Sequence, residues 1–174
     1  AMEFIEGDGL GAIIERLGPV SLARAAHIVR QVSDALAAAH HLGIVHRDLK
    51  PENIMIGRQL DGGDWVKVVD FGIAKTMERE GSSQNVTTIG VSLGTPEYMS
   101  PEQFAGEKLD HRTDIYSLGL VCYNMLTGEL PYPKVTSKET LVRRLTSRPR
   151  PITEARPDVD WPAGLQTALD RALA

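Results

Sequence analysis

The stretch that most constrains this chain is His-Arg-Asp-Leu-Lys-Pro-Glu-Asn at residues 46–53, where polar side chains of different chemistry follow one another closely. A second short run, Asp70-Phe71-Gly72, follows downstream. Two short apolar or β-branched runs with a turn signal between them separate the two stretches, which predicts a β-hairpin. The runs are 54–56 and 66–69, and the turn signal is 61–63. Because a hairpin brings its ends together, we expect Asn53 and Asp70 to meet in space.

The pairing of Asn53 with Asp70 has a chemical consequence. An amide oxygen and a carboxylate held side by side are hard oxygen ligands, suited to a Mg²⁺ ion that also holds phosphate. Asp48 lies on the loop just before the hairpin, where we expect its carboxylate to be free to take a proton.

These runs resemble the catalytic loop and the metal-binding loop of the eukaryotic-type serine/threonine protein kinases. The resemblance continues through Gly-Thr-Pro-Glu-Tyr-Met-Ser-Pro-Glu at 94–102 and Asp-Ile-Tyr-Ser-Leu-Gly at 114–119, in the family's order and spacing. The run Tyr-Met-Ser-Pro-Glu-Gln at 98–103 is most similar to the bacterial members. One such motif alone is weak evidence, but the ordered set is specific and covers essentially the whole chain.

The resemblance implies a role for each polar residue of the site. Asp48 would accept or orient the proton of the substrate hydroxyl, and Lys50 would neutralise the transferring phosphate. Asn53 and Asp70 would hold Mg²⁺, with ATP as the nucleotide. Thr95 would tie the substrate-binding loop to Asp48 and Lys50 through its hydroxyl.

The resemblance also implies an adenine-binding hinge at residues 1–9. The Glu3 carbonyl and the Ile5 N–H would face the base edge, Met2 would lie beside it as the gatekeeper, and Met55 would form the floor under adenine. A frayed N-terminus and a core methionine are the alternative interpretations of the same residues.

Other residues of the motifs are expected to have structural roles. His46 and Phe71 would support the catalytic loop by packing, and Asp114 would hold the backbone of that loop as a buried anion. Glu102 would pair with an arginine further along the domain.

Residues 70–102 would form an activation segment, although its polar composition alone is also that of a mobile loop. Thr87 and Thr88 are the best candidates for phosphorylation by position. Arg47 precedes Asp48, and an arginine there can pair bidentately with a phosphate on the segment. We therefore hypothesise that phosphorylation of Thr87 or Thr88 orders this segment.

Apolar residues at helical spacing predict a mainly α fold with small β-hairpins near the catalytic loop. Arg24 and His40 lie on one of the predicted helices, and we interpret them as solvated or boundary residues without a chemical role. The predicted helices are 10–17, about 22–41, from Asp110 or Thr113 to Gly128, 139–145 and 165–173.

The composition excludes several classes of protein. With 42% hydrophobic and 24% charged residues, 174 residues suffice for one domain with a core. The net charge of −4 gives no basic excess for nucleic acid. A single cysteine allows no intrachain disulfide, and no apolar run has the length of a membrane span. We expect a cytoplasmic location, although a parent protein could be anchored by a segment beyond Ala174.

The resemblance assigns residues 1–174 to the large, C-terminal kinase lobe, with the N-terminal lobe absent. We find no glycine-rich loop between two strands and no Val-Ala-Ile-Lys-like run. We therefore expect a polypeptide of these residues alone to be weakly active or inactive. Apolar groups around Met2, Met55 and Phe71 would be exposed on the face toward the small lobe, which predicts self-association or domain swapping.

Two other functions remain open at this stage. A kinase-like lobe could bind or regulate partners without catalysis, but the intact set of Asp48, Lys50, Asn53 and Asp70 argues against a degenerate parent. A small-molecule phosphotransferase is disfavoured because such enzymes usually lack the Lys-Pro-Glu run and the 95–102 segment that seats a protein substrate.

Overall fold

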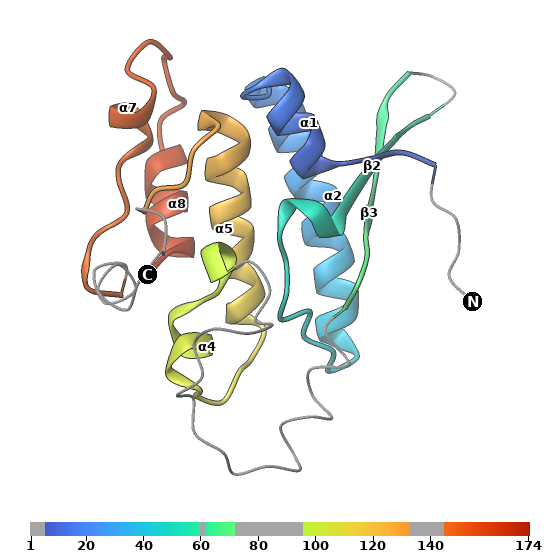
Figure 1. Cartoon of the computed structure of the whole chain (residues 1–174), viewed down its shortest axis with the longest axis vertical. Coiled ribbons are helices and arrows are strands. Elements are labelled where there is room, and N and C mark those ends of the chain that lie inside the picture. The colour runs from blue at the N-terminus through green and yellow to red at the C-terminus, as the bar shows by residue number, and fades with distance from the viewer. Residues whose placement is uncertain (1–5, 60–61, 72–95, 133–144) are drawn as a thin grey trace.

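The computed structural model describes residues 6–59, 62–71, 96–132 and 145–174. Figure 1 shows a mostly helical molecule with a small antiparallel sheet along one side, as the sequence predicts. The elements in chain order are β1 (Asp8–Gly9), α1 (Leu10–Leu17), α2 (Leu22–His41), η1 (Pro51–Asn53), β2 (Ile54–Arg58), β3 (Asp64–Val68), η2 (Pro96–Tyr98), α4 (Pro101–Ala105), α5 (Arg112–Thr127), α7 (Ile152–Ala155) and α8 (Leu165–Ala172).

The long helices α2 and α5 form the centre of the core. Ser21 caps α2, since its hydroxyl accepts the backbone N–H of Arg24 at 3.4 Å. The apolar stripe of α2 is buried, and residues of α5 such as Leu120 and Met125 are fully enclosed. Glycines follow both helices, as expected, and Gly128 has a φ of 78°. The predicted helix at 139–145 falls almost wholly on residues outside the described ranges.

The C-terminal helix α8 packs closely on α5. A Cβ at Gly119 of α5 would lie 3.0 Å from the Cβ of Ala172, so any larger residue there would push α8 or its side chains outward. None of the helices in the described part of the chain is long and apolar enough to cross a membrane.

The predicted hairpin is confirmed. Strands β2 and β3 pair antiparallel, with Ile54 opposite Val68 and Arg58 opposite Asp64. Just beyond the strands the N–H of Val69 donates to the carbonyl of Asn53 at 2.9 Å, so the two ends of the hairpin meet.

The two-residue strand β1 pairs with β2, which makes a three-stranded sheet in the order β1-β2-β3. The sequence does not predict this strand, because two residues cannot show an alternating pattern.

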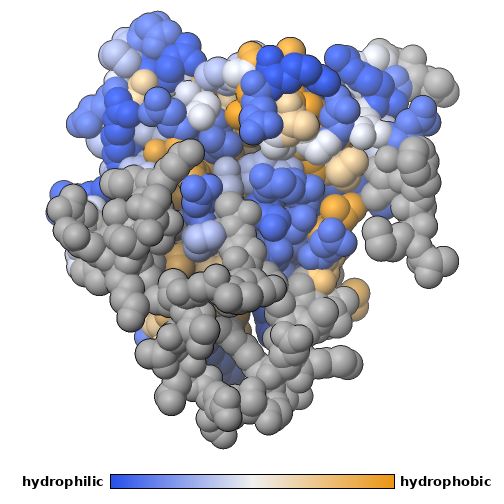
Figure 2. All heavy atoms as spheres, in the orientation of Figure 1, coloured by the Kyte–Doolittle hydropathy of each residue, from blue (hydrophilic) through white to orange (hydrophobic). Residues whose placement is uncertain are grey.

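The described surface is mainly polar. Figure 2 shows hydrophilic residues over most of the described part of the viewed face, with apolar residues in narrow strips between the elements. Large exposed apolar side chains lie apart in the sequence, such as Leu17 at the end of α1 and Leu42 just after α2. Single exposed apolar residues are ordinary for a folded protein.

Candidate active site

The open end of the β2–β3 hairpin, opposite its turn and here called its mouth, is where the predicted site residues lie. Asn53 ends the turn η1, and its side-chain amide donates to the carbonyl of Asp48 at 2.8 Å. The Val69–Asn53 backbone bond places Asp70 one residue beyond the ladder, where it is exposed. Asp70 has a φ of 56°, a left-handed conformation that non-glycine residues rarely adopt.

Asp48 and Lys50 lie next to each other on the loop before the hairpin. Lys50 Nζ is 3.6 Å from Asp48 Oδ2, and the two side chains are 17% and 20% exposed. The side-chain amide of Asn53 lies 3.4 Å from the same carboxylate oxygen. The loop therefore presents a carboxylate, an ammonium group and an amide at one partly open place.

Asp114 of α5 holds the backbone of this loop from below. Its carboxylate is fully buried and accepts the N–H groups of His46 at 2.8 Å and Arg47 at 2.9 Å. Arg47 has a φ of 64°, so it also adopts a left-handed conformation. Strained backbone of this kind persists only where surrounding contacts determine it, and it gathers at functional sites. The predicted role of Asp114 matches these contacts.

His46 connects the loop to the hairpin. Its Nε2 lies 2.9 Å from the carbonyl of Val69, and its Nδ1 accepts the N–H of Asp48 at 3.2 Å. Because a carbonyl can only accept, these two bonds fix the neutral tautomer with the proton on Nε2. Phe71 packs against the same ring, with centroids 4.5 Å apart. Both residues support the loop, in line with the sequence-based expectation.

His40 corrects an interpretation made from the sequence. It lies at the boundary of the core, as one of the two interpretations had it, but it has a structural role, since its Nε2 lies 2.7 Å from Asp114 Oδ2. Arg24 likewise has a partner, because its Nε donates to Asp64 Oδ2 at 2.6 Å. Glu102 accepts the hydroxyl of Thr113 at 2.6 Å, and no arginine partner for it is found within the described ranges.

Gln103 contacts the catalytic loop, which sequence reasoning missed. Its side-chain amide donates to the carbonyl of Arg47 at 2.7 Å, while its Oε1 accepts the N–H of Ser100 at 3.0 Å. A serine followed three residues later by a glutamine is the signature of a capping box, which could have predicted the bond to Ser100. No local pattern predicts the bond to Arg47.

Tyr98, beside the loop, is held neutral by its surroundings. Burial raises the pKa of its phenol, and the negative charges of Glu52 and Glu97 act in the same direction. Its hydroxyl donates to Asn124 of α5 at 3.3 Å, so the ring anchors the segment before α4.

The donor set fits a Mg²⁺ ion that also takes phosphate oxygens. The Asn53 amide uses its nitrogen for the Asp48 carbonyl, which leaves its oxygen turned the other way. Within the described residues no group of three or more His, Cys, Asp or Glu side chains could hold a metal without other ligands. A site of few protein oxygens is the usual arrangement where Mg²⁺ is shared with a nucleotide.

Of the residues predicted to contact adenine, the structure describes Met55. It lies half-buried on β2 opposite Gly9. The other predicted residues of the hinge, of the substrate-binding loop and of the phosphorylation sites lie outside the described residues; they are Met2, Glu3, Ile5, Thr87, Thr88 and Thr95.

Comparison with known families places this geometry in context. A protein-family model described as "Protein kinase domain" matches residues 1–166. Serine/threonine-protein kinase pkn3 of Myxococcus xanthus is 42% identical over 174 residues, which cover 100% of this chain and 32% of that protein. Serine/threonine-protein kinase PknD of Mycobacterium tuberculosis is 40% identical over 173 residues, 99% of this chain and 24% of its own length. The chain thus spans about a third or less of these curated relatives.

Solved structures show the same fold. The PknI kinase domain of Mycobacterium tuberculosis superposes with a TM-score of 0.71 at 26% identity, over 99% of this chain and 56% of that one. Residues 1–466 of Rad53, solved in complex with AMP-PNP, give a TM-score of 0.75 at 25% identity, over 99% of this chain and 41% of that one.

Proposed function

Because this chain belongs to the protein kinase domain family, we propose that it is the C-terminal lobe of a bacterial enzyme that phosphorylates Ser and Thr hydroxyls of proteins with ATP. The observation that carries this proposal is the meeting of Asp48, Lys50 and Asn53 at the mouth of the hairpin that leads to Asp70. The curated relatives are named as serine/threonine-protein kinases, which supports the same substrate class.

The carboxylate and the ammonium group have complementary tasks in the proposed reaction. Asp48 accepts or orients the proton of the substrate hydroxyl, whose oxygen attacks the terminal phosphorus of ATP. Lys50, 3.6 Å from it, offsets the negative charge on the transferring phosphate. Both side chains are partly exposed, so substrate can reach them without unfolding the loop.

Asn53 and Asp70 are the proposed Mg²⁺ ligands. The ion would neutralise charge on the phosphates when bound. The Asn53 amide is held by the Asp48 carbonyl, so its oxygen is oriented before any ion arrives. Met55 is proposed as the floor of the adenine site, with Met2, Glu3 and Ile5 on the hinge at 1–9. AMP-PNP in the similar Rad53 structure supports a nucleotide as the ligand.

The activation segment at 70–102 is the proposed point of control. Phosphate on Thr87 or Thr88 would pair with the guanidinium of Arg47, whose backbone is fixed by Asp114. Thr95 would connect the same segment to Asp48 and Lys50.

The proposal also covers the activity and self-association of the isolated 174-residue polypeptide and the cellular location of the lobe. A polypeptide of these 174 residues alone should transfer phosphate far more slowly than the full-length protein, because it lacks a glycine-rich loop and a strand lysine. We also propose that it self-associates through the face around Met2, Met55 and Phe71, where Met55 and Phe71 are half-buried and not fully exposed as predicted. We place the catalytic lobe in the cytoplasm, where ATP is available.

The test is phosphate transfer from radiolabelled ATP to protein by the purified full-length protein. Asp48→Asn keeps the shape of the side chain but removes the proton acceptor, so we expect transfer to fall by about 10²–10⁴-fold. Asp70→Asn should raise the Mg²⁺ concentration needed for half-maximal activity. Asp160→Asn, an exposed aspartate far along the chain, is the matched control and should have no effect.

Each outcome separates the catalytic proposal from its alternative. Full activity in Asp48→Asn would refute the assigned role of this residue. A wild-type protein that binds partners but transfers no phosphate under any Mg²⁺ concentration would instead favour a non-catalytic, kinase-like binding module.

A further inference from the structure

One peptide group of the catalytic loop is held from two sides. The group that joins Arg47 to Asp48 has its carbonyl bonded by the Gln103 amide at 2.7 Å. The N–H of the same group donates to Nδ1 of His46 at 3.2 Å. Rotation of this peptide plane would break both bonds and would change the φ of Asp48, the residue that carries the carboxylate of the site.

The need for such restraint follows from the backbone. Arg47 has a φ of 64°, a conformation that is strained for a non-glycine residue and persists only where surrounding contacts hold it. Asp114 restrains the plane before Arg47, through the N–H of that residue at 2.9 Å. Gln103 and His46 restrain the plane after it. His46 belongs to the same loop, so Gln103 is the partner that comes from another element.

Gln103 is itself fixed in α4. It occupies the third position of this helix and its Oε1 accepts the N–H of Ser100, which is fully buried at the N-cap. With its oxygen committed to Ser100, the amide nitrogen can point only toward the loop. The segment 96–105 and the loop that carries Asp48 are therefore joined by one side chain.

We propose that Gln103 is a positioning residue, which couples the segment 96–105 to Asp48 through the Arg47 carbonyl. The inference rests on the proposed function, in which Asp48 receives the proton of the substrate hydroxyl and residues 96–102 belong to the activation segment. Gln103 touches neither substrate nor phosphate; it acts on the orientation of the Arg47–Asp48 peptide.

The test uses Gln103→Glu in the full-length protein. A carboxylate keeps the oxygen that accepts the Ser100 N–H but has no proton to donate to the Arg47 carbonyl. We expect kcat to fall by about tenfold while the KM for ATP stays within about twofold, and the melting temperature should fall by less than in Gln103→Ala because the bond to Ser100 is kept. Lowering the pH protonates the introduced carboxyl and restores a donor, so the ratio of variant to wild-type kcat should rise. A purely structural role would not produce this pH profile.

Two further variants complete the design. Gln103→Ala removes the cap as well, so it should lower both kcat and the melting temperature. Gln166→Glu is the matched control on α8, because Gln166 also accepts a backbone N–H, from Ile152 at 2.8 Å, and donates elsewhere through its nitrogen. Its kcat should equal that of wild type.

The outcomes distinguish this inference from the proposed function. Wild-type kcat in Gln103→Glu, or an equal loss in Gln166→Glu, would overturn the inference. If the wild-type protein transfers no phosphate, the proposed function is overturned. The coupling between Gln103 and the catalytic loop can then still be measured by amide hydrogen exchange. Faster exchange at residues 46–49 in Gln103→Glu supports the coupling, and unchanged exchange there refutes it.

Discussion

Two buried carboxylates fasten the hairpin region to the helices, and they do so in different ways. Asp114 is fully buried and accepts backbone N–H groups of the catalytic loop, together with the ring of His40. Asp64, at the far end of the hairpin, is 8% exposed and accepts the guanidinium of Arg24 at 2.6 and 3.2 Å. The Asp114 carboxylate binds main chain and a histidine ring, whereas the Asp64 carboxylate binds arginine side chains.

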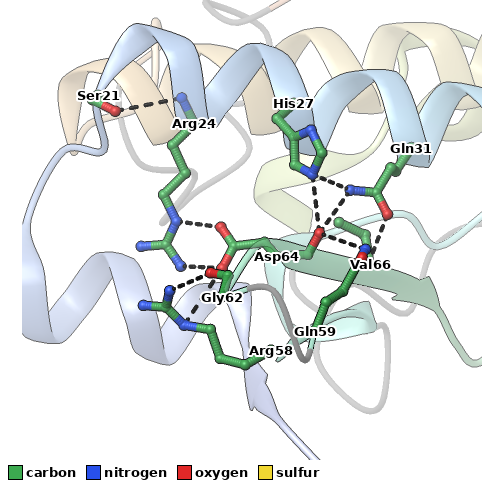
Figure 3. A network of polar contacts seen from close by, with 9 residues as sticks. All are labelled: Ser21, Arg24, His27, Gln31, Arg58, Gln59, Gly62, Asp64 and Val66. Carbon is green, nitrogen blue, oxygen red and sulfur yellow. Dashed lines mark hydrogen bonds and ion pairs between the residues drawn. The ribbon is translucent and has the colours of Figure 1, made fainter.

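The surroundings of Asp64, which we call the hairpin clamp, consist of Arg24, His27 and Gln31 on α2 and Asp64 and Val66 on β3. Figure 3 shows these helix side chains pointing at the strand. The Gln31 amide approaches the carbonyl of Asp64 at 3.2 Å, and its oxygen accepts the N–H of Val66 at 3.1 Å. Strand β3 lies at the edge of the sheet, so the clamp satisfies backbone groups that an edge strand leaves unpaired.

The difference teaches what each anion can control. The partners of Asp114 are backbone groups next to Asp48, so its loss should change the conformation of the loop that carries the chemistry. The side-chain partners of Asp64 are the guanidinium groups of Arg24 and, at 3.9 Å, of Arg58, which can turn to solvent. The loss of Asp64 should therefore loosen the edge of the sheet and leave the loop in place.

Replacing Asp114 with alanine should give the largest loss of unfolding free energy among the variants proposed, and replacing Asp64 a smaller one. Asp114→Ala leaves the N–H groups of His46 and Arg47 buried without an acceptor, and we expect it to cost about 3–5 kcal/mol of unfolding free energy. Asp64→Ala should cost about 1–3 kcal/mol, since Arg24 is 27% exposed and can be rehydrated. Urea unfolding measures both variants.

The phosphate-transfer activities of Asp114→Ala and Asp64→Ala test whether only the carboxylate next to the catalytic loop controls the site. Phosphate transfer should be lost in Asp114→Ala and kept in Asp64→Ala at a temperature where both are folded. Equal loss of activity would show that the far end of the hairpin also sets the geometry of the site, and the distinction drawn here would fail.

Local pattern made much of this molecule predictable. The helices α1, α2, α5 and α8 follow from apolar spacing, and the hairpin follows from two short runs around a glycine turn, because neighbours in sequence determine both. The short helices α4 and α7 were not predicted, since four or five residues show too little periodicity. The site residues Asp48, Lys50 and Asn53 follow from a motif whose members are neighbours on one loop.

Contacts between distant residues were not predictable. Arg24 pairs with Asp64 across 40 positions, and His40 with Asp114 across 74. The sequence contains many arginines, histidines and aspartates, and no spacing rule says which of them meet once helices pack. Gln103 belongs to the same class, because its bond to Arg47 depends on how α4 approaches the loop.

A substitution inside the hairpin tests whether its far end is mechanically separate from the site. The Trp65 ring lies across Gly57, so a Cβ there would come within 2.1 Å of the indole. Gly57→Ala must displace the ring, and we expect it to cost about 1–3 kcal/mol of stability with kcat unchanged. Urea unfolding and single-turnover phosphate transfer test this. A parallel drop in kcat would mean that strain passes along β2 to Asn53.

His40 beside Asp114 and His27 beside Asp64 allow the same comparison with smaller expected effects. His40→Ala removes one donor from Asp114 and should cost about 1–2 kcal/mol with a lowered kcat. His27, 2.9 Å from the Asp64 carbonyl, shares that carbonyl with Gln31, so His27→Ala should cost less than about 1 kcal/mol and leave kcat unchanged. Thermal melts and steady-state kinetics measure both. If His27→Ala lowered kcat as much as His40→Ala, the clamp would have to be counted as part of the site.

The exposed pair of Arg156 and Asp158 shows what a carboxylate contributes without burial. The guanidinium donates to both carboxylate oxygens, at 2.9 and 2.8 Å, and these hydrogen bonds lower the pKa of Asp158. Because the pKa is lower in the folded chain than in the unfolded one, the stabilising contribution is present at neutral pH and is lost as the pH falls through the lowered pKa. Solvent screens such a pair, so Asp158→Asn should lower the melting temperature at pH 7 by less than about 2 °C, and this difference should shrink as the pH falls through the lowered pKa. Circular-dichroism melts at several pH values measure it. A loss at pH 7 as large as that of Asp64→Ala would mean that donor geometry, and not burial, gives the carboxylates of this chain their effect.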